Sequence, residues 1–504
     1  MCTVCQMTGS FDPARHGEDW SLAQFSEGTD AAAGTGTIYT MAPGDSFLGQ
    51  LGVTGDRDWV AVTLDAGQSY DIALSGFAGG GGTLEDAYLR IHDGTGAQVA
   101  QNDDGGAGLD SALTFTASVT GTYYLSAGGF DDGETGTYTL TISTGGTSGG
   151  GGSGAAGTLD QLADYLVDGY WNDGRRAFDT SADANLTVNL TALTAEGQQL
   201  ARWALEAWEM VADLRFTEVT GRADIDFDDD EQGAFAGSTY NSNGVISSAN
   251  VNVDASWIAA YGAGIGSYSF STYIHEIGHA LGLGHQGGYN GTATYPNDAT
   301  FANDSYQLSI MSYFSQTDNT SVNASYAEPV SAMMADIIAI QNLYGAPGES
   351  SATAGNTVWG RNGTLGTHMD DYFSGSADYD GEPVTYAIYD LNGTDLLDVS
   401  FSTTNDRLDL TAGSISDLFG LIGNVTIARD TVIENARTGS GNDAIQGNSA
   451  ANDLSSGGGA DLVYAGAGND TVSGEAGADE LYGGPGNDSV MGGDGMDTLG
   501  GSSG

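Results

Sequence analysis

The spacing of hydrophobic and polar residues changes along the chain, and the first regular pattern has a period of two. Between residues 35 and 144, short runs alternate apolar and polar positions and are separated by turns rich in Asp and Gly. Examples are Trp59–Leu64, Tyr70–Leu74, Ala87–Ile91 and Gly136–Ile142. Such alternation predicts strands with one buried face. Their regular succession predicts an N-terminal antiparallel β-sandwich.

A helical period appears after residue 157. Leu200, Trp203, Ala204 and Ala207 lie on one side of a helix that Thr194 can cap. Further helices are expected at Thr158–Trp171 and Val330–Tyr344, and strands at Asn185–Leu190, Ala223–Phe227 and Val245–Val253. This mixture predicts an α/β (α+β) domain over residues 158–345.

The last part of the chain, residues 346–504, is β-rich and ends in a nine-residue repeat from residue 438 onward. The sixth position of the repeat is Asp443, Asn452, Asp461, Asp470, Asp479, Asp488 and Asp497, and the eighth is Ile445, Leu454, Val463, Val472, Leu481, Val490 and Leu499. A flexible linker does not place an apolar residue at every ninth position. The repeat matches the calcium-binding pattern G-G-x-G-x-D-x-U-x and predicts a parallel β-roll.

Glycine and aspartate have separate functions in such a repeat. The glycines permit tight turns, whereas carboxylates and turn carbonyls offer oxygen ligands to Ca²⁺. We therefore expect several structural calcium ions, held by the aspartates at the sixth position of the repeat. The repeat glycines expected at the same sites are Gly439, Gly441, Gly457, Gly459, Gly466, Gly468, Gly477, Gly484, Gly486, Gly493 and Gly495.

Two segments have no periodic pattern. Residues 1–34 are polar and are expected to form a tail or propeptide, and residues 145–157, GGTSGGGGSGAAG, form a flexible linker. Cys2 and Cys5, in the tail, are the only cysteines. One C-x-x-C pair cannot build a four-cysteine zinc site, so we expect reactive thiols on a mobile tail or, as a minority interpretation, a thiolate that blocks a metal site.

The charge balance excludes some partners. There are 67 acidic and 12 basic residues, a net charge of −55, so nucleic acid is not an expected partner. No apolar run approaches the length of about 18 residues of a membrane-spanning helix. The N-terminus lacks both the basic and the apolar region of a secretory signal peptide.

The strongest chemical motif contains three of the six histidines of the chain, His275, His279 and His285. His275 and His279 are four residues apart, so both imidazoles project from one face of a helix, and Gly282 can turn the chain to bring in His285. Three nitrogen ligands with an open position are typical of catalytic zinc. Glu276 can then act as the base for water at the metal. The alternative is an amphipathic helix with buried core histidines.

A second motif, Ser309–Tyr313, contains Met311, lies downstream and is expected to form a Met-turn. With the long zinc motif it resembles the metzincin peptidases, and Met-Ser-Tyr resembles the serralysin branch. Together with the repeats, residues 158–504 resemble a serralysin-type zinc peptidase. Residues Asp56–Trp59, Leu89–Ile91 and the strand beginning at Gly136 resemble bacterial pre-peptidase C-terminal domains.

The resemblance implies a secreted zinc endopeptidase that acts on proteins and peptides, is stabilised by calcium and is monomeric. It implies that Tyr313 binds the zinc and moves to stabilise the oxyanion, while Met311 forms an apolar floor. It also implies export by a type I secretion machinery that reads a C-terminal signal. Because the chain stops at Gly504, within an eighth repeat, either it is truncated or its signal is unusual. The alternatives are an inactive adhesin or matrix protein and an astacin-like metzincin.

Overall fold

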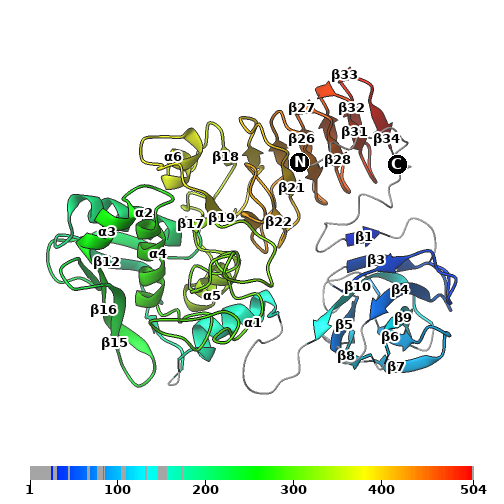
Figure 1. Cartoon of the computed structure of the whole chain (residues 1–504), viewed down its shortest axis with the longest axis horizontal. Coiled ribbons are helices and arrows are strands. Elements are labelled where there is room, and N and C mark those ends of the chain that lie inside the picture. Colours follow the sequence, from blue (N-terminus) through cyan, green and yellow to red (C-terminus); the bar gives the residue numbers. More distant parts are fainter. Residues whose placement is uncertain are drawn as a thin grey trace, which may run out of the picture. The chain divides into compact units, whose positions relative to one another are not determined.

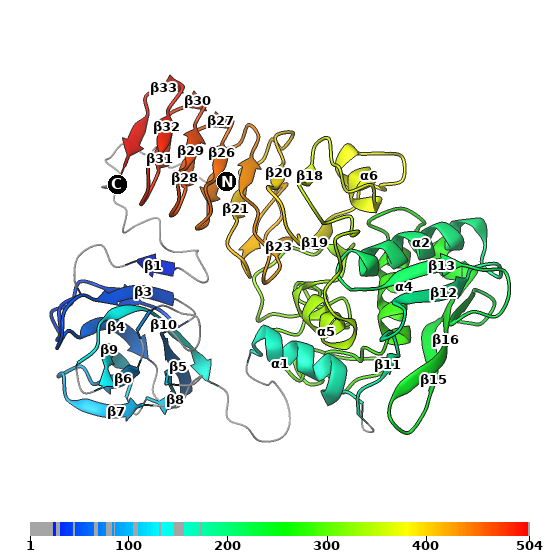
Figure 2. The ribbon, with the colours of Figure 1, turned by 180° about the vertical axis from the view of Figure 1, so that it is seen from behind.

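The computed structural model describes residues 24–26, 31–43, 46–64, 69–76, 83–84, 86–103, 109–117, 119–130, 133–145, 156–171 and 174–501. The chain forms two compact units, Met1–Gly150 and Gly151–Gly504, which are coloured along the sequence in Figures 1 and 2. Cys2 and Cys5, together with residues 146–155 of the predicted linker, lie outside the described residues.

The N-terminal unit contains two five-stranded sheets, as the period of two predicted. The order in the first is β1-β3-β10-β5-β8 and in the second β2-β4-β9-β6-β7. Their bounds are β1 Gln24–Ser26, β2 Thr40–Met41, β3 Ser46–Leu51, β4 Asp58–Leu64, β5 Ser69–Ser75, β6 Ala87–His92, β7 Gln98–Asn102, β8 Ser111–Thr116, β9 Gly121–Gly129 and β10 Gly136–Gly145.

Neighbouring strands of this unit are antiparallel except for β1 on β3 and β2 on β4. In β4, Val60, Val62 and Leu64 are buried and alternate with more exposed residues, so one face of the strand packs into the core. Strand β1 belongs to the segment expected to be a tail, and it pairs in parallel with β3.

The second unit begins with a mixed α/β region that holds the histidine motif. Its elements are α1 Leu159–Asp164, the π-helix η3 Tyr165–Gly169, β11 Ala177–Phe178, β12 Asn185–Asn189, α2 Ala195–Glu209, β13 Arg215–Glu218, β14 Ile225–Asp228, β15 Ala234–Tyr240, β16 Val245–Val253, α3 Ala255–Tyr261, α4 Tyr268–Ala280, β17 Glu328–Pro329 and α5 Met334–Tyr344.

The sheet of this region places an antiparallel strand beside the helix with the histidines. Strands β11, β16, β14, β12 and β13 follow one another in parallel, and β15 pairs antiparallel with β16. In the described part of the chain, β16 is the only strand partner of β15. Helices α2 and α4 pack together, and the Trp208 indole donates to the Ile274 carbonyl at 3.1 Å.

The predicted helices are present, with differences at their ends. Thr158, Thr194 and Ser267 each accept a backbone hydrogen bond at a helix start, as capping residues do. The helix predicted over Val330–Tyr344 is α5, which begins at Met334 and not at Val330. The Val330 amide donates to the Thr385 carbonyl at 3.0 Å, so the residues before α5 are extended against the C-terminal region.

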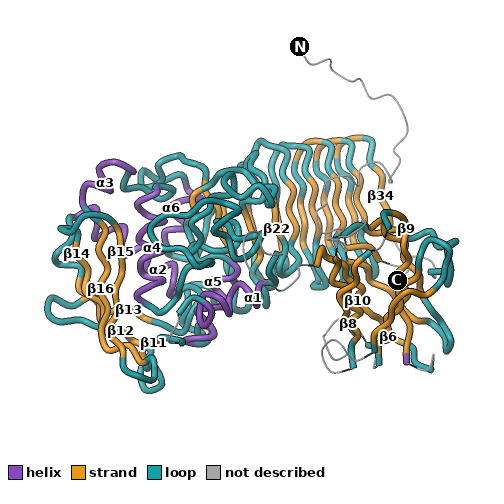
Figure 3. The backbone as a smooth tube through the Cα atoms, turned by 60° about the horizontal axis from the view of Figure 1, so that its bottom comes forward, coloured by secondary structure: helices purple, strands orange, loops and turns teal. Residues whose placement is uncertain are grey.

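The C-terminal region is built of short strands in parallel stacks (Figure 3). Its elements are β18 Val358–Gly360, α6 His368–Ser374, β19 Val384–Ile388, β20 Leu396–Asp398, β21 Arg407–Asp409, β22 Ile415–Ser416, β23 Val425–Ile427, β24 Asn435–Arg437, β25 Ala444–Gln446, β26 Asp453–Ser455, β27 Gly458–Gly459, β28 Leu462–Tyr464, β29 Thr471–Ser473, β30 Ala476–Gly477, β31 Glu480–Tyr482, β32 Ser489–Met491, β33 Asp494–Gly495 and β34 Thr498–Gly500.

Two consecutive repeats make one turn of the stack. Residues 18 positions apart are paired, as in Ile445 with Val463 and Val463 with Leu481, so odd and even repeats form separate parallel sheets. The predicted β-roll is confirmed. The eighth-position residues from Ile445 to Leu481 are buried, whereas Leu499 is 51% exposed because no described turn packs over it.

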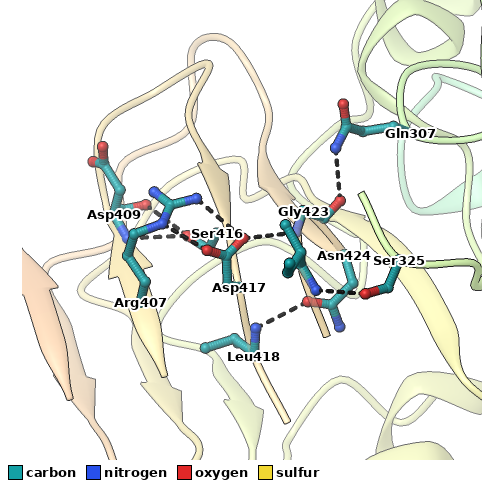
Figure 4. A network of polar contacts seen from close by, with 10 residues as sticks. Gln307, Ser325, Arg407, Asp409, Ser416, Asp417, Leu418, Gly423 and Asn424 are labelled. Atoms are coloured by element: carbon teal, nitrogen blue, oxygen red, sulfur yellow. Dashed lines mark hydrogen bonds and ion pairs between the residues drawn. The ribbon is translucent and has the colours of Figure 1, made fainter. Parts of the chain in front are cut away.

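The α/β region and the C-terminal region share one hydrophobic core, which extends from Leu162 to Leu481. Polar contacts join them close to the Met-turn (Figure 4). The Gln307 amide donates to the Gly423 carbonyl at 3.0 Å, and the Gly423 amide donates to Asp417 at 2.6 Å. Arg407 pairs with the same Asp417 at 2.8 Å. The segment before the Met-turn is thus held by the C-terminal region.

Candidate active site

The three histidines predicted as ligands are brought together. His275 and His279 lie one turn apart on α4, and Gly282 has the positive φ of 109° that allows the turn to His285. A Cβ at Gly282 would lie 2.1 Å from the Arg176 carbonyl oxygen. One nitrogen from each of the three histidines can be chosen so that all lie within 4.8 Å of one another.

Each histidine is oriented by a backbone carbonyl. The Nδ1 atoms of His275, His279 and His285 lie 2.8, 2.8 and 2.9 Å from the carbonyl oxygens of Ile310, Leu283 and Tyr289. A carbonyl only accepts, so each Nδ1 carries a proton and each Nε2 presents a lone pair. This arrangement is the usual second layer of contacts around a metal-binding histidine.

The unprotonated nitrogens face one another. His279 Nε2 and His285 Nε2 are 2.9 Å apart, although neither can donate when both Nδ1 atoms are protonated. Burial lowers the pKa of His275 to about 4 and, with His275 beside it, that of His279 to about 3; the pKa of His285 is also lowered, mainly by burial. Three neutral, converging imidazoles fit a divalent cation such as Zn²⁺.

Glu276 points toward the edge strand rather than taking part in the cluster of nitrogens. It is 7% exposed, accepts a hydrogen bond from the Ala236 amide of β15, and its Oε2 has no partner among the described residues. Burial raises the pKa of this carboxyl to about 8, against the opposite effect of the Ala236 amide. A carboxylate with one free oxygen is suited to accept and return a proton.

The Met-turn packs directly beneath α4. Met311 is fully buried, and a Cβ on Gly278 would lie 2.6 Å from the Met311 sulfur and 3.0 Å from the Trp208 ring. The absence of a side chain at Gly278 therefore permits this close packing. Met311 thus packs on α4 between His275 and His279, and its function as an apolar floor of the zinc site stays a prediction.

Tyr313 lies beside the histidines. Its ring centroid is 4.4 Å from that of His285 and 5.9 Å from that of His275. The ring stacks on Tyr289 at 4.8 Å, and its hydroxyl accepts a bond from the Gly291 amide at 3.4 Å. Burial raises the pKa of its phenol.

Four residues that support this site were not predicted from the sequence. Asp336, fully buried in α5, accepts from the Ser309 hydroxyl at 2.6 Å and from the Ile310 amide at 2.7 Å, and Ile310 supplies the carbonyl that orients His275. A single acidic residue within the apolar run of this helix is the signal that could have identified it.

The other three support His285 and the Met-turn. The Tyr170 hydroxyl lies 3.1 Å from His285 Nδ1. Tyr289 donates to buried Asp304 at 3.0 Å, and Asp304 also accepts from Ser312 at 2.6 Å. No sequence motif marks these residues, because their partners are distant in the chain or belong to the backbone.

The repeat aspartates lie in register along the roll. The Oδ1 atoms of Asp461 and Asp479 accept the backbone amides of Asp443 and Asp461, each from the preceding turn. The second oxygens of four of them are buried without a hydrogen-bond partner in the described part of the chain, namely Asp443, Asp461, Asp470 and Asp479.

The repeat glycines lie where neighbouring turns are closest. A Cβ on any of the predicted glycines, from Gly439 to Gly495, would lie 2.3 Å or less from a carbonyl oxygen of another turn. Gly459, for example, has a φ of 143°.

Comparison with known proteins agrees with this arrangement. Residues 56–129 match the bacterial pre-peptidase C-terminal domain, residues 182–327 match Matrixin, and residues 349–499 match the Peptidase M10 serralysin C-terminal family. A crystal structure of the pre-peptidase C-terminal domain of a Bacillus anthracis collagenase aligns with 21% of this chain and 92% of its own, at 20% identity and a TM-score of 0.16.

Related sequences are found among the serralysins. Metallopeptidase AprA of Pseudomonas marginalis is 34% identical over 327 residues, which is 58% of this chain and 66% of AprA. Serralysin C of Dickeya chrysanthemi is 40% identical over 277 residues, 50% of this chain and 53% of its own. The chain thus spans about half to two thirds of the length of these relatives. With a pre-peptidase C-terminal domain, a matrixin domain and a serralysin C-terminal region, the chain belongs to the serralysin-type M10 metallopeptidases.

Proposed function

We propose that the protein is a zinc endopeptidase that hydrolyses peptide bonds in proteins. The observation that carries the proposal is the convergence of three neutral imidazoles, with Glu276 beside them offering one oxygen that has no partner within the described residues. An inactive adhesin that retained the fold would not require a base at this position. The similarity to Metallopeptidase AprA of Pseudomonas marginalis supports the same activity.

His275, His279 and His285 would hold the zinc, with Tyr313 as a further ligand. When bound, Zn²⁺ supplies a Lewis acid that activates water, polarises the scissile carbonyl and lowers the raised pKa of Glu276. Glu276 takes the proton of the attacking water and returns it to the leaving amine. Tyr313, 4.4 Å from His285 between ring centroids, donates its hydroxyl proton as a hydrogen bond to the developing oxyanion.

Strand β15 would hold the substrate. In the described part of the chain it pairs only with β16, and its Ala236 amide contacts Glu276. An extended peptide added to the free edge of β15 would bring its backbone beside the catalytic base.

We further propose that calcium occupies the β-roll. Four buried carboxylate oxygens with no hydrogen-bond partner among the described residues support it, as does the pKa of Asp461, which burial raises to about 6. Oxygen ligands repeated at the turns fit Ca²⁺. In the described part of the chain, no helix has the length and apolar character needed to cross a membrane. From the resemblance to serralysins we propose that the enzyme is secreted and exported by a type I machinery.

Casein zymography tests the enzymatic function. The protein should clear casein, lose this activity in a zinc chelator such as 1,10-phenanthroline, and regain it when Zn²⁺ is restored. Equal clearing in excess chelator, or no clearing at any zinc concentration, would reject the proposed zinc endopeptidase.

A further inference from the structure

Three aromatic rings cluster where helices α3 and α4 meet. Trp257 and Tyr261 come from α3, and Tyr268 is the first residue of α4. Trp257 stacks on Tyr268 with centroids 5.9 Å apart and planes 23° apart, and Tyr261 meets Tyr268 edge-on at 5.2 Å. We call these three residues the aromatic cluster.

The cluster lies on the face of α4 that carries the catalytic base. Tyr268, Thr272 and Glu276 are spaced by four residues, so they follow one another along one side of the helix. Eight helical residues rise about 12 Å. An extended peptide covers this length in roughly three to four residues.

Electrostatic interactions link Tyr268 of the cluster to the proposed catalytic residues. Burial, followed by Glu328, raises the pKa of Tyr268 to about 12, and Glu276 and Tyr313 both add to the effect. Tyr268 therefore interacts electrostatically with both proposed catalytic residues, from the end of α4 away from Gly282.

Two rings of the cluster remain open to solvent although they pack on one another. Tyr261 is 51% exposed and Tyr268 is 37% exposed, although each contacts another ring of the cluster. Rings held in place by stacking but open to solvent offer rigid apolar surface with little loss of side-chain freedom on binding.

We propose that the aromatic cluster is a substrate subsite that binds an aromatic or large aliphatic side chain three to four residues from the scissile bond. The inference rests on the proposed endopeptidase function and adds a sequence preference to it. Specificity arises because a small side chain at this position leaves the rings hydrated, whereas a large one covers them.

The test compares internally quenched peptides that differ at one position. The residue three or four positions from the cleaved bond, on either side, is Tyr, Leu or Ala in otherwise identical peptides. At one of these positions the wild-type enzyme should cleave the Tyr and Leu peptides with kcat/KM roughly tenfold above the Ala peptide. Tyr268→Ala and, separately, Tyr261→Ala should reduce this ratio to near one.

Tyr464→Ala is the matched control, because Tyr464 is also 37% exposed but lies in the β-roll. It should keep the wild-type ratio, and circular dichroism shows whether each variant is folded. A wild-type enzyme that cleaves casein but has no preference at these positions, or an unchanged ratio in both folded cluster variants, would overturn the subsite alone. Failure of the wild type to cleave any substrate would reject the proposed function, and the subsite with it.

Discussion

At the scale of single residues, the site depends on which atom of each side chain is left free. His275, His279 and His285 use Nδ1 for a carbonyl and keep Nε2 available, and Glu276 uses one oxygen for the Ala236 amide. The spacing of the motif predicted the ligands and the base. It could not predict their supporting contacts, because the Ile310 carbonyl belongs to a segment 35 residues from His275.

Tyr313 is expected to act mainly in the transition state. Tyr313→Phe keeps the ring that stacks on Tyr289 but removes the hydroxyl. We expect kcat to fall by roughly 10- to 10³-fold, with a small change in KM and in zinc content, as for the loss of one oxyanion donor. Steady-state kinetics on a quenched peptide check this. Unchanged kcat and KM would leave Tyr313 with a packing function only.

Asp336 is expected to position His275 through the backbone of Ile310. Asp336→Asn replaces one acceptor oxygen with an NH₂ group among three donors, the Ser309 hydroxyl and the amides of Ile310 and Met333. Zinc affinity should fall about 10- to 100-fold, as is typical for a supporting contact of a metal ligand. Competition with a fluorescent chelator measures it.

Asp453→Asn is the control for this change, since Asp453 is exposed on the β-roll. Its zinc affinity should equal that of the wild type. An Asp336→Asn protein with wild-type affinity would show that the Met-turn holds its position without the carboxylate.

At the scale of elements, local signals located the helices well but failed where a distant segment decides the conformation. Thr194 and Ser267 cap their helices as expected. Residues 330–333 have an apolar helical pattern, yet the Val330 amide bonds to Thr385, and the helix begins four residues late. Helix α6, His368–Ser374, was not predicted, because it is short and lies within a β-rich region.

The packing of α4 on the Met-turn should be sensitive to one methyl group. Gly278→Ala adds a Cβ that would lie 2.6 Å from the Met311 sulfur. Despite the better helix propensity of Ala, we expect a loss of about 1–3 kcal/mol in the free energy of unfolding, as for other overpacked cores. Urea unfolding measures it. Gly348→Ala, where nothing lies within 4 Å of the added atom, is the control; equal stability of both variants would contradict the packing.

At the scale of the whole molecule, the repeat was the most predictable part. One apolar residue in nine, from Ile445 to Leu481, fixes the interior of the roll, and the 18-residue pairing follows from two repeats per turn. The shared core with the α/β region could not be predicted, because contacts such as Gln307 with Gly423 depend on the tertiary arrangement and leave no periodic signal.

Calcium should control the stability of the C-terminal region. Residues 438–504 carry ten acidic and no basic side chains, so without cations the ordered roll is opposed by repulsion and chain entropy. The full-length protein should lose β-sheet signal in chelator and regain it with millimolar Ca²⁺, whereas Mg²⁺ substitutes poorly.

Two variants separate specific binding from general screening. Asp461→Asn alters a buried carboxylate whose second oxygen has no partner in the described part of the chain, and should need more Ca²⁺ for the same melting temperature. Asp453→Asn removes an exposed charge and should not. Melting that is identical in Ca²⁺ and in excess chelator would contradict calcium binding by the roll.

The central claim, that Glu276 is the base beside a zinc held by three histidines, is tested most directly by measuring metal content and hydrolysis together in Glu276→Ala. The proposed zinc ligands are the three histidines and do not include the Glu276 carboxylate. The variant should therefore retain one zinc per chain by elemental analysis. It should hydrolyse casein at least 10²- to 10⁴-fold more slowly than the wild type, the typical contribution of an acid–base group. A zinc-loaded Glu276→Ala protein that cleaves casein at the wild-type rate would contradict the account.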